Sequence, residues 1–322
     1  MNIAFLTDMN FTGKILVDFE NMRTEFAWMH ALDAQHLPLI KWCDIPIQTD
    51  IVIVILPKDQ SKIPNNFSIE QLKQTFPNTK VGMQQEGPVW YYQDYSIDGQ
   101  YRYLCDLLDA DFILTHSGND KYYYQGIVKH DRVYVNPTLM ITNEAIYSNK
   151  ADRSGVIIGG NFCSWYGGFD SYVIAKIFNT PISAPRMGRM PKEELIYDNN
   201  GEITHLPYMS WNQWINNLKQ YRYAVHLMRP SVAGTFSLNC AYWGIPCVGY
   251  QQLDTQRECH PYTSVQNCDL ISARVLACKL RDDNEFYELC SKTAVDNYNK
   301  YYGVEVYREK MGQVLEEIRN GV

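Results

Sequence analysis

Short apolar runs alternate with helical patterns along the first half of the chain. The clearest run is Ile51–Leu56, in which β-branched residues follow one another without a polar break. This pattern predicts a central parallel strand that is covered on both faces. Further strands are predicted at Asn2–Thr7, Leu39–Trp42, Lys80–Gln84, Phe112–Thr115 and Val133–Val135. Helices are predicted between them, around Phe26–Leu32 and over Ile69–Phe76, Tyr95–Leu108 and Lys121–Ile127.

The second half shows the same alternation. Strands are predicted at Val156–Ile158, Ile182–Ser183, Ala224–Met228 and Ile245–Gly249. Helices are predicted over residues 170–178, 211–218, 234–244, 269–280, 284–301 and 306–318. Strands that alternate with helices at this spacing indicate doubly wound parallel sheets.

The length of 322 residues predicts two domains of about 150 residues each. Residues 136–153 carry no convincing pattern and are interpreted as the connection. We therefore expect one Rossmann-like domain at residues 1–150 and a second at residues 151–305. Residues 306–322 form a C-terminal helix that could cross back to the first domain. The predicted fold class is α/β, with two doubly wound Rossmann-like domains facing across a cleft.

Composition and charge narrow the range of functions. Hydrophobic residues make up 46% of the chain, which suits a packed globular protein and not a disordered one. Neither a signal peptide nor an apolar run of membrane-spanning length is present in the sequence, so a cytoplasmic location is expected. The net charge of −7 argues mildly against tight nucleic-acid binding, but leaves a local basic groove open. The nine cysteines include no Cys-x-x-Cys pair and are expected to be reduced thiols.

The stretch Leu227–Gly249 combines a strand, a glycine-containing turn, a helix and a second strand. The helix pattern opens at Gly234-Thr235 and stops at Gly244. Because the first N–H groups of a helix have no partner inside the helix, its N-terminus can bind an anion. Arg229 and Arg186 each follow a predicted strand, where a guanidinium could pair with phosphate oxygens. The alternative for each arginine is an ordinary ion pair. Arg189 and Lys192 are weaker candidates of the same kind.

Three motifs make the chain resemble the two-Rossmann-domain (GT-B) glycosyltransferases. They are Val156-Ile157-Ile158-Gly159-Gly160-Asn161, the stretch from Leu206 to Trp214, and the stretch from Arg229 to Pro246 with its Gly244-Ile245-Pro246. The resemblance implies that the last stretch binds the nucleoside diphosphate of a sugar donor, with a UDP-sugar as co-substrate and no tightly bound cofactor. The implied donor contacts are Gly160, Asn161, Arg186, Arg229, Ser231, Gly234, Thr235 and Asn239. Asn239 stands where the family often has a glutamate, which puts the identity of the donor in doubt.

In size and in the layout of the first half, the chain also resembles the compact bacteriophage enzymes that glycosylate hydroxymethylated DNA bases. Those enzymes carry a carboxylate after the fourth strand, where Glu86 stands here, and a Ser/His pair at a strand end, as at His116-Ser117. The acceptor implied is a hydroxymethylated base in bacteriophage DNA, and the location implied is then the host cytoplasm.

An inverting transferase needs a base for the proton of the acceptor hydroxyl. Glu86 is the candidate because it follows the predicted strand Lys80–Gln84, and Asp8 and His116 are its rivals. A solvated loop carboxylate is the alternative for Glu86. Gly13, Trp90 and His116 are the expected acceptor contacts, and the alternative for Trp90 is a hydrophobic plug over the following helix. His226, inside a predicted strand, is interpreted as a satisfied core histidine.

Other functions stay open at this point. The acceptor could be a glycan or a lipid, and the chain could be a non-catalytic nucleotide-sugar-binding module or an epimerase of nucleotide sugars. No Asp-x-Asp run occupies a plausible donor position, so no metal site is predicted. The identity of the sugar, the stereochemistry of transfer and the oligomeric state are not predicted.

Overall fold

The computed structural model describes residues 1–22, 24–128, 130–143, 152–186 and 200–321. The chain forms two compact units. Unit 1 comprises Met1–Phe19, Glu25–Pro137 and the C-terminal segment from Val304, and unit 2 comprises Glu20–Thr24 and Thr138–Gly303. The units therefore divide between Pro137 and Thr138 and not at residue 150. Five residues near the N-terminus also pack with unit 2, where the Trp211 N–H donates to the Glu20 carbonyl at 3.0 Å.

Unit 1 is built on a seven-stranded sheet in the order β2-β3-β1-β4-β5-β6-β7. All neighbouring strands run parallel except β2 and β3. The strands are β1 (Ile3–Thr7), β2 (Gly13–Lys14), β3 (Gln35–Pro38), β4 (Ile51–Val54), β5 (Lys80–Gln84), β6 (Phe112–Thr115) and β7 (Val133–Val135). The helices are α1 (Glu25–Ala31), α2 (Ile69–Thr75), α3 (Ile97–Asp109), α4 (Gly118–Val128) and α12 (Val304–Asn320), with 3₁₀ turns at Leu39–Asp44, Gln60–Lys62 and Tyr91–Asp94.

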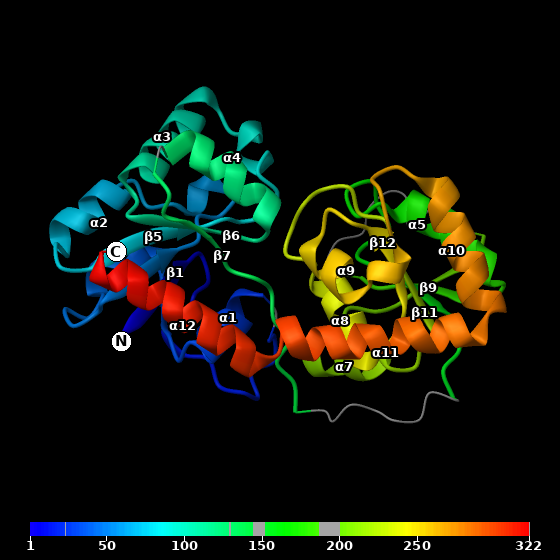
Figure 1. The fold of residues 1–322 in the computed structure, drawn as a ribbon. Helices are drawn as coiled ribbons and strands as arrows, with labels where there is room; N and C mark the ends of the chain where they lie inside the picture. Colours follow the sequence, from blue (N-terminus) through cyan, green and yellow to red (C-terminus); the bar gives the residue numbers. More distant parts are fainter. Residues whose placement is uncertain (23, 129, 144–151, 187–199, 322) are drawn as a thin grey trace. The chain divides into compact units, whose positions relative to one another are not determined.

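Helices cover both faces of this sheet. The side chains of α2, α3 and α4 share one core with the strands, and α1 and α12 lie on the other face (Figure 1). Every residue of β4 is fully buried, which confirms the central strand predicted from its β-branched run. The C-terminal helix is tied to unit 1 because Tyr307 Oη donates to Asn136 Oδ1 at 2.8 Å and Arg308 Nε donates to the Ala31 carbonyl at 3.1 Å.

Unit 2 contains a six-stranded, fully parallel sheet in the order β10-β9-β8-β11-β12-β13. Its strands are β8 (Val156–Ile158), β9 (Ile182–Ala184), β10 (Ile203–His205), β11 (Tyr223–His226), β12 (Cys247–Tyr250) and β13 (Ser264–Val265). Its helices are α5 (Gly168–Ala175), α7 (Trp211–Leu218), α8 (Thr235–Trp243), α9 (Asp254–Cys259), α10 (Leu270–Asp282) and α11 (Asn284–Tyr301), with 3₁₀ turns at Lys176–Phe178 and Pro261–Thr263. Numbered from β8, the order is 3-2-1-4-5-6, the order of a dinucleotide-binding sheet.

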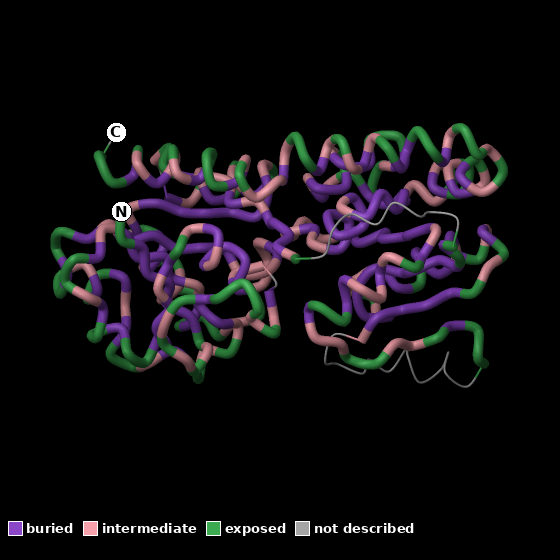
Figure 2. The backbone as a smooth tube through the Cα atoms, turned by 90° about the horizontal axis from the view of Figure 1, so that it is seen from below, coloured by how far each residue is buried: buried purple, intermediate pink, exposed green. Residues whose placement is uncertain are grey.

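Burial follows the expected layers. The strands are buried along nearly their whole length, whereas the long C-terminal helices alternate between buried and exposed residues (Figure 2). In unit 2, α5 and α10 pack together with the sheet, while α8 contacts α7, α9 and α11. No helix among residues 1–22, 24–128, 130–143, 152–186 and 200–321 is both long and apolar enough to cross a membrane.

Several local predictions need correction. Leu39–Trp42 is not a strand: it lies in a 3₁₀ helix, and the strand is β3 just before it, which pairs with β1 and β2. Leu39 and Trp42 are both buried, and a three-residue spacing puts side chains on one face of a 3₁₀ helix. The short elements β2, β10, α9 and β13 were also not predicted, because runs of two to six residues show little periodicity.

Candidate active site

The loop after β5 presents Glu86, and Gln85 holds that loop in place. The Gln85 side chain accepts from the His116 N–H at 3.2 Å and donates to the Gly87 carbonyl at 2.7 Å and to Asp120 at 3.1 Å. Three segments of unit 1 are thereby joined at one amide. A turn held in this way gives Glu86 a defined position at the carboxyl edge of the sheet, where ligands of doubly wound folds bind.

Burial, together with the nearby charges of Asp8 and Glu25, raises the pKa of the Glu86 carboxyl to about 7. A hydrogen bond from the Lys58 backbone and the charge of Lys62 oppose this shift. The Oε2 atom is buried and has no hydrogen-bond partner among the described residues. A carboxylate whose pKa lies near neutral pH and which keeps an open acceptor is suited to general-base catalysis.

Asp8, the rival base, is differently placed. It follows β1, and its carboxylate forms an ion pair with Lys62 Nζ at 2.6 Å. The two side chains are 29% and 54% exposed, so the pair is solvated and contributes little to stability. Asp8 nevertheless supplies negative charge beside Glu86.

The expected acceptor contacts belong to three segments of unit 1. His116 is buried at the end of β6 and stacks on Trp28, with 5.7 Å between the ring centres. Burial lowers the pKa of His116 to about 4, so its imidazole is neutral at pH 7. Trp90 is half-buried, directly before the 3₁₀ turn at Tyr91–Asp94. Gly13 opens β2, with open space where a side chain would stand.

In unit 2 the strand order reverses between β8 and β11, and this switch point is where ligands of such sheets bind. The loop after β8 carries Gly160 and Asn161, and Asn161 is buried with its carbonyl accepting from the Cys163 N–H at 2.9 Å. The loop closes at Gly167, which has φ +65° and would place a Cβ atom 2.0 Å from the Leu227 carbonyl oxygen. Only glycine therefore lets the β8 loop lie against the segment that follows β11.

Arg229 lies in the segment between β11 and α8, and its side chain extends toward solvent. Its Nε and Nη2 donate to Asp170 Oδ2 at 3.3 and 2.9 Å. Asp170, in the first turn of α5, is largely buried and also accepts from Tyr250 Oη at 3.3 Å. The Arg229 side chain remains 56% exposed, and its Nη1 has no partner in the part of the chain that the structure describes. An ion pair was the alternative considered for Arg229, and here the pair leaves part of the guanidinium open to a ligand.

The other basic candidates are less defined. Arg186 is half-buried, two residues beyond the end of β9. Arg189 and Lys192 lie outside the described residues. Ser231 is half-buried in the segment between β11 and α8.

Gly234 caps the start of α8 with φ +72°. A Cβ atom at this position would lie 2.1 Å from Thr255 Oγ1. The Gly234 carbonyl accepts from Ser237 Oγ at 3.0 Å and from Thr255 Oγ1 at 2.9 Å. Thr235 Oγ1 lies 3.1 Å from Thr138 Oγ1. No side chain of the described residues caps the helix start, so its first N–H groups can bind an anion.

Asn239 faces the interior. It is 1% exposed, and with its amide correctly oriented it accepts from Trp214 Nε1 and donates to the Thr235 carbonyl, both at 3.0 Å. Its polar atoms therefore join α7 to α8. We leave it out of the donor contacts proposed below.

Sequence reasoning missed one residue at the switch point and described a second only in part. Asp170 orients Arg229 from 59 positions away, and no local pattern signals such a pair. His226 was expected to be a satisfied core histidine. It is buried at the end of β11, but neither ring nitrogen has a hydrogen-bond partner among the described residues. Burial lowers the pKa of His226 to about 4, so the ring is neutral, and it packs against Gly159 and Phe236.

Metal chemistry has no evident ligands in the described part of the chain, where no three His, Cys, Asp or Glu side chains gather as a metal site would require. The cysteines described in both units are free thiols.

Comparison with solved structures identifies the fold. Sucrose-phosphate synthase from Thermosynechococcus elongatus superposes with a TM-score of 0.69 at 13% identity, over 100% of each chain. Anabaena HepE in complex with UDP gives 0.69 at 9% identity, over 98% of this chain and 100% of HepE. An α-glucosyltransferase in complex with UDP and a 13-mer DNA containing a hydroxymethyluracil base gives 0.64 at 12% identity, over 98% of each chain.

Staphylococcus aureus TarM is also similar, with a TM-score of 0.62 at 10% identity, and the chain spans about half of TarM's length, 55%. The sequence itself matches no protein-family model and no curated protein sequence. The structural likenesses confirm the predicted class: the chain has the α/β fold of the GT-B glycosyltransferases, with a parallel sheet in each of two units.

Proposed function

We propose that this protein is a glycosyltransferase that moves a sugar from a nucleoside-diphosphate sugar, with UDP as the nucleotide, to an acceptor hydroxyl. The observation that carries the proposal is the pair of groups at the switch point of unit 2. These are the uncapped start of α8 and the guanidinium of Arg229, oriented by Asp170. Helix N–H groups and a guanidinium are the two kinds of group that bind a diphosphate without a metal ion. Three of the four compared structures contain UDP, which supports this choice.

Glu86 is the proposed base. The acceptor oxygen forms a bond to the anomeric carbon of the sugar while the bond from that carbon to the diphosphate oxygen breaks. The acceptor proton passes to the Glu86 carboxylate, and the electron pair of the broken bond leaves with the diphosphate. Arg229 and the α8 N–H groups stabilise that developing charge. A base on the acceptor side favours inversion at the anomeric carbon. Gly13, Trp90 and His116 are proposed to contact the acceptor, with Asp8 keeping Glu86 basic.

The first experiment measures binding and turnover separately. Calorimetric titration of the protein with UDP and GDP is expected to show binding of UDP, and incubation with labelled UDP-sugars is expected to release UDP. Absence of nucleotide binding and of sugar release across the panel contradicts the proposal. Conversion of a UDP-sugar to its epimer without an acceptor identifies an epimerase, and binding without any turnover identifies a sensor.

The sharper form of the proposal takes a hydroxymethylated base in DNA as the acceptor. The full-length likeness to the α-glucosyltransferase bound to DNA supports it, while the net charge of −7 favours a small neutral acceptor such as a glycan or a lipid-linked sugar. Duplexes with 5-hydroxymethyluracil or 5-hydroxymethylcytosine, matched to unmodified duplexes, are incubated with the donor found above. Mass spectrometry then detects a hexose on the modified strand. Sugar release without transfer to either modified duplex assigns the acceptor to the glycan or lipid class.

A further inference from the structure

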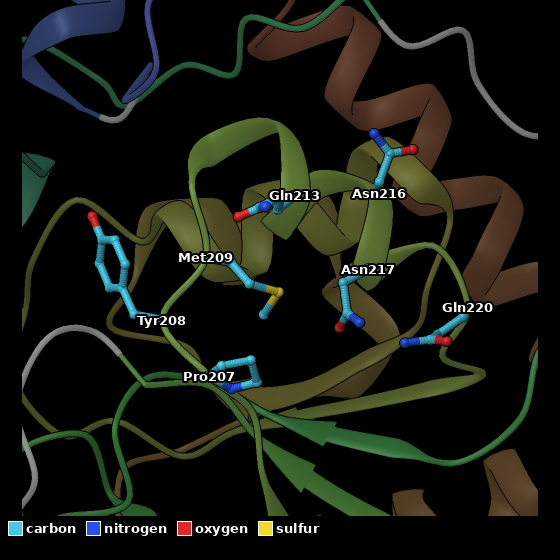
Figure 3. A pocket seen from close by; sticks show the side chains of 7 residues that line it. All are labelled: Pro207, Tyr208, Met209, Gln213, Asn216, Asn217 and Gln220. Carbon is cyan, nitrogen blue, oxygen red and sulfur yellow. The ribbon is translucent and has the colours of Figure 1, made fainter.

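A groove of about 560 Å³ runs beside α7 in unit 2 (Figure 3). The loop between β10 and α7 supplies one end of it, and α7 with its following turn supplies the rest. The lining residues are Pro207, Tyr208, Met209, Gln213, Asn216, Asn217 and Gln220. None of the seven carries a charge.

The lining combines one open aromatic ring with four amides. Tyr208 is 58% exposed, and an exposed tyrosine offers a flat apolar face with a polar tip. Each amide side chain carries both hydrogen-bond donors and acceptors. Figure 3 shows the Asn217 and Gln220 side chains projecting from α7 and the turn after it toward the groove end beside Pro207.

One polar atom in the wall is unsatisfied. Asn217 Oδ1 is shielded from solvent and accepts no hydrogen bond from any described residue. Buried acceptors in native structures nearly always have a partner. The Gln213 side-chain oxygen Oε1, in contrast, accepts from the Ser210 N–H at 3.0 Å, and Asn216 Oδ1 accepts from Lys219 Nζ at 2.6 Å.

The charge of the lining decides against several ligand classes. A phosphate polymer or an acidic peptide needs cations, and the nearby Lys219 ammonium is already used by Asn216. An apolar helix needs a wide hydrophobic face, and here four of seven lining groups are amides. A neutral chain rich in hydroxyls matches both the amides and the tyrosine face.

We propose that this groove binds a neutral oligosaccharide, at a site separate from the donor groups. The groove is called separate because its lining shares no residue with the proposed donor contacts, although α7 packs on α8. The proposal does not depend on the transferase activity. A sugar polymer held here is anchored by repeated hydroxyl contacts and by one ring on Tyr208.

The test titrates the full chain with maltohexaose, cellohexaose and chitohexaose by calorimetry. At least one is expected to bind, and Tyr208→Ala and Asn217→Ala are each expected to weaken it about tenfold, the effect of roughly 1.4 kcal/mol. Matched controls are Tyr122→Ala, whose tyrosine is 77% exposed in unit 1, and Asn212→Ala, an exposed amide on α7 outside the groove. Both controls are expected to bind as the unaltered protein does.

Saturating UDP is included in a second titration. Unchanged oligosaccharide affinity is expected, and competition by UDP would overturn the proposal by placing the groove within the nucleotide site. Absence of binding by all three oligosaccharides, or equal losses in the groove variants and the controls, would also overturn it. Because UDP affinity is measured on the same samples, failure of this inference is distinguished from failure of the proposed transferase function.

Discussion

Two nitrogens of Arg229 donate to one carboxylate oxygen of Asp170, at 2.9 and 3.3 Å. The carboxylate is anchored in the first turn of α5 and also accepts from Tyr250. These two hydrogen bonds restrict the rotamers of the Arg229 side chain and fix its orientation at the switch point of the sheet. Substitution of Arg229 or Asp170 therefore tests whether this ion pair contributes to donor binding.

Arg229→Ala is expected to weaken UDP binding about 10- to 100-fold, since a hydrogen bond to a charged group contributes about 1.5–3 kcal/mol. Arg229→Lys keeps the charge but loses the planar fork, so partial recovery is expected. Asp170→Asn should give a smaller loss by releasing the guanidinium. Calorimetric titration with UDP measures all three, with thermal melting as the check on folding. Unchanged UDP affinity in Arg229→Ala would remove Arg229 from the donor site.

Glu86→Gln is expected to lower the rate of transfer by about two to four orders of magnitude, the range for a lost general base. UDP affinity should stay the same, because Glu86 belongs to the acceptor half. For the unaltered protein, kcat/KM should rise with pH through about 7 and then level, since only the ionised carboxylate accepts the proton. Glu309→Gln, at an exposed position of α12, is the matched control. A pH profile in Glu86→Gln that matches that of the unaltered protein would exclude Glu86 as the base.

The raised pKa of Glu86 also makes a prediction about stability. The folded protein holds this proton more tightly than the unfolded chain, where the pKa is near 4.5. Its contribution to stability is therefore complete below pH 4.5 and is lost as the pH rises through about 7. Glu86→Gln should melt at a higher temperature than the unaltered protein at pH 8 and at the same temperature near pH 4. If the difference in melting temperature between Glu86→Gln and the unaltered protein does not increase from pH 4 to pH 8, the raised pKa of Glu86 is contradicted.

Gly234→Ala is expected to destabilise the protein by at least about 1–3 kcal/mol, the range for a strained backbone residue. The position has φ +72°, and a Cβ atom would press on Thr255 Oγ1. Gly312→Ala in α12 is the opposite case, because nothing lies within 4 Å of the added carbon. There a gain of about 0.5–1 kcal/mol is expected from helix propensity. Urea unfolding of both variants measures the change in the free energy of unfolding, which should decrease for Gly234→Ala and increase for Gly312→Ala.

Asn239→Ala is expected to destabilise the protein by about 1–3 kcal/mol, because it leaves the buried Trp214 Nε1 without an acceptor. UDP affinity of the folded variant should be unchanged, since both amide atoms are used between α7 and α8. Asn212→Ala on α7 serves as the surface control. Loss of UDP binding in a variant that melts normally would return Asn239 to the donor contacts.

Regular elements were predictable where the local pattern is strong. The β-branched run of β4 and the capping serines of α2 and α7 mark their elements directly. Gly234 and Gly244 bound α8 because both adopt left-handed conformations. Edge strands such as β2 and β10 lack these signals, since one side of each faces no further strand. Likewise, the sequence contains no marker for the division after Pro137, which depends on which segments pack together.

The sequence by itself determined the class of fold and pointed to the two stretches proposed as the site, the loop after β5 and the segment from Arg229 to Gly234. Periodicity, glycine and the end of a strand are local properties, and these signals can be read along the chain. Only the tertiary structure decided what each side chain does there. Burial raised the pKa of Glu86. Asp170 forms an ion pair with Arg229, which lies 59 positions away in the sequence. Asn239 uses its side-chain amide for hydrogen bonds between α7 and α8. Burial and long-range partners depend on the whole fold, so residue type alone does not specify them.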